Sequence, residues 1–239
     1  MDLPVWQELR TELHPKGLEV VTVALDINIE SARPWIEAAN SDHPSLIDSR
    51  HALDEFLGVV QVPTGVWMDE QGMIVRPPEI APGKNLAEMF EQMGRPADEP
   101  PELTAQIEAS MELQLDRAPY HAALRDWVER GDASPHALSP DEVVARSRPR
   151  PPEVAEAAAC FELGQHLHRA GYPEDAVRWF RETHRLQPDN WTYRRQAWSL
   201  VNPLQVPTAA MEGEWPYEGD WLTDYHATTA EGYYPPPQL

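Results

Sequence analysis

Residues 62–75 have the sequence VPTGVWMDEQGMIV, in which two short apolar runs follow a loop proline and flank a polar turn. Residues 65–68 and residues 73–75 are each compatible with a short strand. The intervening DEQG places a glycine in the turn, where a hairpin connection favours one. This stretch therefore predicts a β-hairpin that begins directly after Pro63.

Helices and strands alternate in the chain before this hairpin. Leu3–Leu13 has apolar residues at helical spacing. Leu18–Leu25 is nearly continuous and rich in β-branched residues, which is typical of a strand buried on both faces. We also expect a helix capped by Ser31, an extended segment at His43–Ile47, and helices at Arg50–Leu57 and Asn85–Met93. This order predicts an α/β sheet with parallel pairing and an antiparallel edge.

The motif around Pro63 resembles that of a known family. Val62-Pro63-Thr64, then a strand, Asp69-x-x-Gly72 and a second strand, is similar to the corresponding segment of thioredoxin-like proteins of the TlpA/ResA type. The resemblance covers about residues 1–94. It implies that Pro63 is preceded by a cis peptide bond and that Val62, Pro63 and Thr64 bind a substrate peptide, with Val62 offering its backbone. The alternative is an ordinary loop proline before a hairpin.

The first residues extend this resemblance. MDLPVWQEL at residues 1–9 resembles the segment that follows the redox motif W-C-x-x-C in this family, and LEVVTVALD at residues 18–26 resembles the next strand. The resemblance implies that the motif and the central strand lie upstream of Met1. Without that strand the two expected neighbours share no partner, and each unpaired buried backbone group costs about 1–3 kcal/mol. We therefore expect an upstream segment that carries the redox cysteine, or a selenocysteine encoded by UGA.

A helical repeat is expected in the second half. Leu163-Gly164, Gly171, Ala176, Phe180 and Pro188 have the spacing of a tetratricopeptide repeat. The predicted helices are Glu153–Ala170, Pro173–Leu186 and Asn190–Leu200. A single unit cannot bury its own face, so it must pack on residues 102–130 or on the thioredoxin-like domain. A generic helical hairpin is the alternative.

The expected fold class is an N-terminally incomplete α/β thioredoxin-like domain followed by an all-α, tetratricopeptide-like region. The resulting regions are a thioredoxin-like domain at 1–97, a helical connector with a proline-rich linker at 98–152, the repeat-like unit at 153–200, and an irregular, aromatic and proline-rich tail at 201–239.

The bulk composition narrows the classes of partner. The chain of 239 residues has 40 acidic and 19 basic residues, for a formal net charge of −21. An acidic protein repels nucleic acid and anionic membranes, so neither is an expected partner, and the charge itself is explained by solubility. The sequence shows no signal peptide and no apolar run of the roughly 20 residues that span a bilayer, which predicts a cytoplasmic protein.

Few side chains in this sequence carry reactive chemistry. Cys160 is its one cysteine, so these residues alone cannot run a two-cysteine redox cycle. We expect Cys160 to pack as a small apolar residue rather than act as a reactive thiol. His166 and His168 are two residues apart on a predicted helix and face different sides, so they do not form a metal pair. No cofactor or metal is expected, and Trp6 and Trp67 are expected in the core rather than as a ligand platform.

Two functions follow as alternatives. The first is a thiol–disulfide oxidoreductase or thiol-dependent peroxidase whose cysteine or selenocysteine lies upstream, so that residues 1–239 alone are inactive. Its partners would be a protein thiol or disulfide, or a peroxide. The second is a non-catalytic thioredoxin-fold scaffold whose helical unit binds a partner protein.

Overall fold

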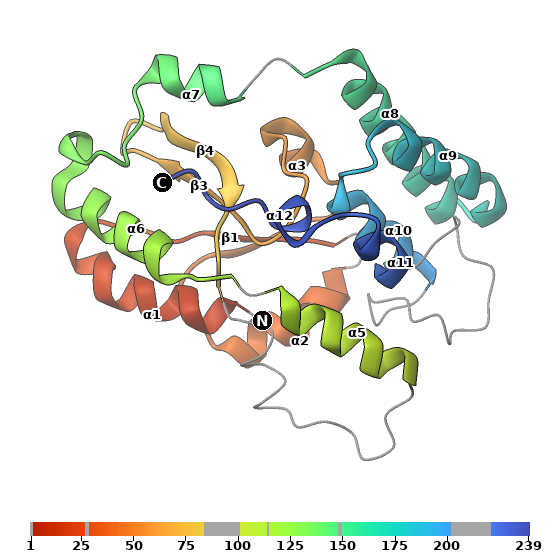
Figure 1. The fold of residues 1–239 in the computed structure, drawn as a ribbon, viewed down its shortest axis with the longest axis horizontal. Coiled ribbons are helices and arrows are strands. Elements are labelled where there is room, and N and C mark those ends of the chain that lie inside the picture. Colours follow the sequence, from red (N-terminus) through yellow and green to blue (C-terminus); the bar gives the residue numbers. More distant parts are fainter. Residues whose placement is uncertain (1, 27–28, 84–100, 114, 148–149, 202–220) are drawn as a thin grey trace.

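The computed structural model describes the chain except residues 1, 27–28, 84–100, 114, 148–149 and 202–220 (Figure 1). The helix expected at Asn85–Met93 lies outside the described residues. The elements of the first part are α1 (Leu3–Leu13), the 3-10 turn η1 (His14–Lys16), β1 (Thr22–Leu25), α2 (Ile29–Ala39), β2 (Ser45–Asp48), α3 (Ala52–Leu57), β3 (Thr64–Met68) and β4 (Ile74–Ile80).

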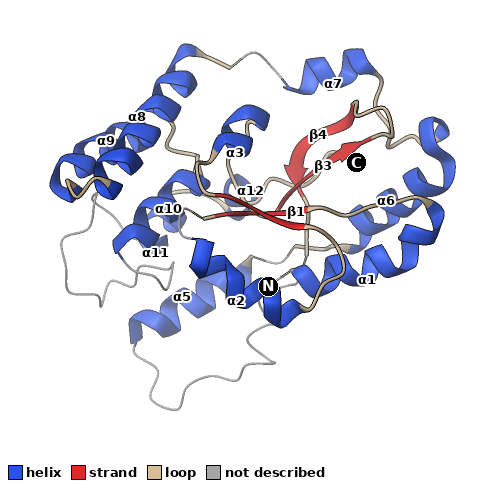
Figure 2. Ribbon diagram, turned by 180° about the vertical axis from the view of Figure 1, so that it is seen from behind, coloured by secondary structure: helices blue, strands red, loops and turns tan. Residues whose placement is uncertain are grey.

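The strands form two separate small sheets (Figure 2). β1 pairs in parallel with β2, with Thr22 opposite Ser45, and β3 pairs antiparallel with β4. Within the described residues, β1 and β3 therefore have one strand partner each and share none. All four residues of β1 are only half-buried. The expectation of a strand over Leu18–Leu25 that is buried on both faces is therefore wrong, because the strand covers only Thr22–Leu25 and neither of its faces is fully covered.

The hairpin predicted after Pro63 is confirmed as β3 and β4. Asp69 stabilises its turn, since the Oδ1 atom accepts the backbone N–H groups of Gln71 (2.9 Å) and Met73 (2.8 Å). Gly72 has a φ of 78°, the left-handed region that glycine adopts without strain. β4 is longer than predicted and continues to Ile80, through two prolines that the sequence pattern did not assign to a strand.

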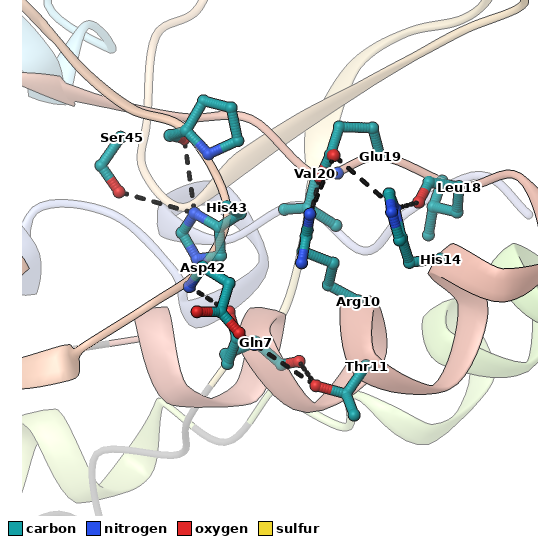
Figure 3. Close-up of polar contacts among 11 residues, drawn as sticks. Gln7, Arg10, Thr11, His14, Leu18, Glu19, Val20, Asp42, His43 and Ser45 are labelled. Atoms are coloured by element: carbon teal, nitrogen blue, oxygen red, sulfur yellow. Dashed lines mark hydrogen bonds and ion pairs between the residues drawn. The ribbon is translucent and has the colours of Figure 1, made fainter.

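Polar contacts fix α1 against the entries to β1 and β2 (Figure 3). Arg10 binds Glu19 through two nitrogen–oxygen contacts of 2.6 and 3.1 Å. The Gln7 Oε1 atom accepts the backbone N–H of Asp42 at 2.9 Å. These contacts hold α1 in a defined orientation relative to both strands.

The first core lies between α1, the β3–β4 hairpin and α6 (Ala118–Arg130). Its buried members are Leu9, Leu13, Trp67, Val75, Ala81, Tyr120, Ala123 and Leu124. The prediction that Trp67 belongs to the core is confirmed, whereas Trp6 packs half-buried at its margin. α6 comes from the region expected to be a connector, and it supplies three of these core residues.

The rest of the described chain is helical. Besides α6 it comprises α5 (Pro101–Glu112), η2 (Gly131–Ala133), α7 (Pro140–Ser147), α8 (Pro152–Arg169), α9 (Pro173–Leu186), α10 (Trp191–Val201), α11 (Trp221–His226) and α12 (Ala230–Tyr233). The positions of α8, α9 and α10 agree with the predicted helices to within one residue at each end. In the segment expected to be irregular, α11 and α12 are helical, but they are too short to show a periodic pattern.

The second core unites α5 with α8–α12. Its buried members are Ala109, Leu113, Ala158, Phe161, Ala176, Phe180, Trp191, Tyr193, Ala197, Tyr225 and Tyr233. α8 and α9 approach closely at Gly164, where an added Cβ would lie 2.8 Å from the Phe180 ring. This close contact requires a small residue at position 164, which is where the repeat spacing expects one. None of the described helices has the length and apolarity that a membrane crossing demands.

The contact between β3 and α6 generates a stability prediction. A Cβ on Gly65 would lie 2.5 Å from the Tyr120 hydroxyl, which accepts the Trp67 indole N–H at 2.7 Å. We expect Gly65→Ala to lower the free energy of unfolding by about 1–3 kcal/mol through overpacking. In a Tyr120→Phe background, which lacks the clashing oxygen, the same change should cost less. Urea unfolding of the four proteins measures this cycle, and an equal cost in both backgrounds would refute the contact.

Candidate functional site

The Val62–Pro63 peptide bond is cis, as predicted. The loop around it is held by its own polar groups: the Thr64 hydroxyl donates to the Gln61 carbonyl (2.6 Å), and the Gln61 Oε1 atom accepts the Val62 N–H (3.0 Å). The Pro63 carbonyl accepts the N–H of Ala81, the residue after β4. The loop that contains all three expected binding residues, Val62, Pro63 and Thr64, is therefore fixed to the hairpin.

Two later segments of the chain contact this loop. The first residue of α10, Trp191, donates its N–H to the Val60 carbonyl at 2.7 Å. From the C-terminal segment, the Tyr234 hydroxyl donates to the Val62 carbonyl at 3.3 Å. The Gln61 side-chain amide donates to the Tyr233 carbonyl at 3.1 Å. Residues more than 120 positions downstream therefore form one wall of the candidate site.

The N-terminal end of α1 forms another wall. Asp2, which precedes the helix, packs so closely on Gly83 that an added Cβ there would lie 2.5 Å from the Asp2 carboxyl carbon. The Asp2 charge also acts on the Tyr234 hydroxyl, whose pKa it raises. The start of α1 therefore lies against the segment that follows β4, and β4 leads toward the N label in Figure 1.

A half-buried arginine determines the electrostatics of this wall. The Arg195 guanidinium of α10 hydrogen-bonds both tyrosine hydroxyls and lies 5.8 Å from the centre of the Tyr233 ring. Burial raises the pKa of Tyr234 to about 12, although Arg195 opposes the shift. The hydroxyl therefore stays protonated at neutral pH and remains a donor to the Val62 carbonyl.

A second polar cluster joins α3 to the helices of the second core. His51 is buried, with its Nδ1 atom 2.9 Å from Asp54 Oδ2 and its Nε2 atom 2.9 Å from Gln196 Oε1. Its ring lies 5.1 Å from the Phe161 ring. Burial alone would lower the pKa of His51, but the hydrogen bonds and charge of Asp54, with Gln196, raise it overall. Two oxygen partners fit a protonated imidazole that donates from both nitrogens.

Cys160 lies in α8, where it is buried, as predicted for a packing residue. Burial raises the pKa of its thiol, which disfavours the reactive thiolate. His166 is exposed on the outer side of α8. Across the residues that the structure describes, no group of three histidine, cysteine or acidic side chains is arranged to hold a metal ion.

An open hollow of about 630 Å³ lies along the outer side of α8 and faces the turn before α3. Its lining comprises Ser49, Arg50, Ala159, Glu162, Leu163, His166 and Arg169. Two of these side chains, Arg50 and Arg169, are arginines, which give the hollow basic groups in a chain with a net charge of −21.

Sequence reasoning identified the cis-proline loop but missed most residues that surround it. Gln61, Arg195, Tyr233 and Tyr234 come from segments far apart in the chain, and their contacts have no local spacing pattern. The signal that could have been used is compositional: two adjacent tyrosines before three consecutive prolines at residues 233–237. No protein-family model, curated protein or solved structure matches the chain.

The raised pKa of His51 predicts a pH-dependent stability. Its contribution should be fully present below about pH 6.5, the ordinary histidine pKa, and should be lost as the pH rises through the higher folded-state value. We therefore expect His51→Gln to lose more stability relative to the unchanged protein at about pH 5.5 than at about pH 8.5. Urea unfolding at both pH values measures the difference.

Because each variant is compared with the unchanged protein at the same pH, the contributions of the other histidines cancel. These include His184, for which burial lowers the pKa to about 3. His166→Gln, a change at an exposed position, serves as the matched control and should show no such pH dependence. An equal loss of stability for His51→Gln at both pH values would rule out the protonated His51–Asp54 pair.

Proposed function

We propose that this chain belongs to a thiol–disulfide oxidoreductase or thiol-dependent peroxidase of the thioredoxin-like class, with its nucleophile in a segment upstream of Met1. The observation that carries the proposal is that β1 and β3, the expected neighbours of the upstream strand, share no partner among the described strands. By resemblance, the Val62-Pro63-Thr64 loop and helix α1 supply the other parts of the site. In the family that the sequence resembles, this helix follows the redox motif and the proline lies against it.

The open edges of the two sheets support the same proposal. β1 and β3 have no common partner among the described strands. β1 is also only half-buried, whereas a strand in the interior of a complete, covered sheet would be buried. A strand inserted between them would pair both edges and place its following residues at the start of α1. The redox motif would then lie at the N-terminus of α1, whose dipole favours a thiolate or selenolate.

The chemistry would be thiol–disulfide exchange. The thiolate attacks one sulfur of a substrate disulfide, a new S–S bond forms, and the other substrate sulfur leaves as a thiolate that takes a proton from water. A second thiol, from the motif or from an external dithiol, then resolves the mixed disulfide and supplies the remaining electrons. With a peroxide, the thiolate would attack one peroxide oxygen to form a sulfenic acid while the O–O bond breaks and the other oxygen leaves as hydroxide, which takes a proton. The external dithiol would then reduce the sulfenic acid to the thiol, with release of water and formation of the dithiol's own disulfide.

An assay of two forms of the protein tests this function. We expect residues 1–239 to show no turnover of insulin disulfides or hydrogen peroxide above that of dithiothreitol alone. The form extended upstream in its natural reading frame should be active on at least one of them. Cys160→Ala should leave the activity of the extended form unchanged, because Cys160 is buried in α8. An inactive extended form, or a reading frame without a Cys or UGA codon before Met1, would contradict the proposal.

The second candidate is a non-catalytic module that binds a partner protein through α8. The hollow along α8 favours it, because it joins the helical unit to the Ser49–Arg50 turn in one concave surface. An inactive extended form that still binds a partner, with loss of binding on Arg50→Glu, would support this candidate.

A further inference from the structure

The C-terminal segment contacts the cis-proline loop through Tyr233 and Tyr234, and it then runs over the surface to an anchor on β4 at Gln238. It passes from α12 across β4, and is drawn in blue toward the C label in Figure 1. Residues 235–237 are consecutive prolines, which have no backbone N–H and favour an extended conformation. The segment from Tyr233 to Gln238, termed here the tail strap, therefore has the form of an extended bound peptide.

Main-chain atoms anchor the far end of the tail strap. The Gln238 carbonyl accepts from Arg76 Nη2 at 2.5 Å and from Arg146 Nη1 at 2.9 Å. The Gln238 N–H donates to Glu79 Oε2 at 3.1 Å. Arg76 is only 1% exposed and is itself bound by Glu79, so this anchor is built into β4. Recognition through backbone atoms is how proteins commonly bind extended peptides.

The near end of the tail strap occupies the polar groups of the loop. The Pro63 carbonyl is used by Ala81, on the β4 side of the hairpin. The preceding carbonyl, that of Val62, accepts the Tyr234 hydroxyl, and the Gln61 amide binds the Tyr233 carbonyl. Arg195 secures both tyrosines from α10. An incoming peptide that needs the Val62 carbonyl would therefore meet the tail strap first.

We propose that the tail strap is a built-in cover of the peptide site, and that an extended protein substrate binds at the cis-proline loop only when the strap is displaced. This inference rests on the proposed function and specifies its regulation. Because the strap is tethered, it competes at an effective concentration that is about millimolar for short flexible linkers. A small peroxide needs no peptide groove, so the cover would restrict protein disulfides selectively.

Two variants of the extended form loosen the strap at different ends. Tyr234→Phe keeps the aromatic ring and removes the hydroxyl donor to Val62. A chain that ends at Tyr234 keeps both tyrosines and removes the anchor on Arg76. Tyr172→Phe is the matched control, because Tyr172 is 58% exposed in the α8–α9 turn.

The experiment compares insulin disulfide reduction with hydrogen peroxide reduction, both with dithiothreitol as the reductant. We expect kcat/KM for insulin to rise about two- to tenfold in each strap variant, the range that corresponds to one hydrogen bond. Tyr172→Phe should leave it unchanged, and peroxide reduction should be the same in all forms. Amide hydrogen exchange should show faster exchange at Tyr234 in the chain that ends there.

The outcomes separate this inference from the function on which it rests. An active extended form whose insulin reduction is unchanged or slower in both strap variants would overturn the cover and leave the proposed function standing. An equal rise in peroxide and insulin reduction would also overturn it, because the strap would then affect the reactive group itself. Absence of activity in every form would contradict the proposed function and the cover together.

Discussion

β1 and β3 each present one strand edge that has no strand partner in the described part of the chain. Backbone N–H and C=O groups are costly to bury unpaired, and this constraint shapes the first half of the molecule. β1 remains half-buried, and the hairpin forms its own core with α1 and α6. The cis-proline loop lies next to the open edge of β3. The proposed site therefore adjoins a strand that has one open edge among the described strands.

α10 connects this site to the helical half. Its first N–H binds the Val60 carbonyl, Arg195 holds the two tyrosines, and Gln196 reaches the buried His51. The single repeat-like unit could not bury its own face, and the structure provides both of the expected partners. Ala109 of α5 and Leu113, the residue that follows α5, enter its core, and His51 of the first half packs on Phe161. The helical region is therefore part of the wall of the site.

Local patterns in the sequence predicted the hairpin and most of the helices, but the cap expected at Ser31 is wrong because α2 already begins at Ile29. α1 and α9 have the predicted bounds, because a helix depends on apolar spacing, prolines and glycines within a few residues. The cis bond before Pro63 followed from a short motif. The burial of β1 was predicted wrongly, because it depends on which other segments pack on the two faces of the strand and not on the residues of the strand alone. Arg195 and Tyr234 were missed because long-range contacts between non-adjacent segments have no periodic signature.

The claim that β1 and β3 await a common strand is tested most directly by amide hydrogen exchange. Exchange is compared between residues 1–239 and the form extended upstream in its natural reading frame. The account predicts that amides in residues 22–25 and 64–68 on the open edges exchange rapidly in the shorter form and at least about tenfold more slowly in the extended one. Equal exchange rates in the two forms would show that no upstream strand pairs with these edges, and would contradict the account.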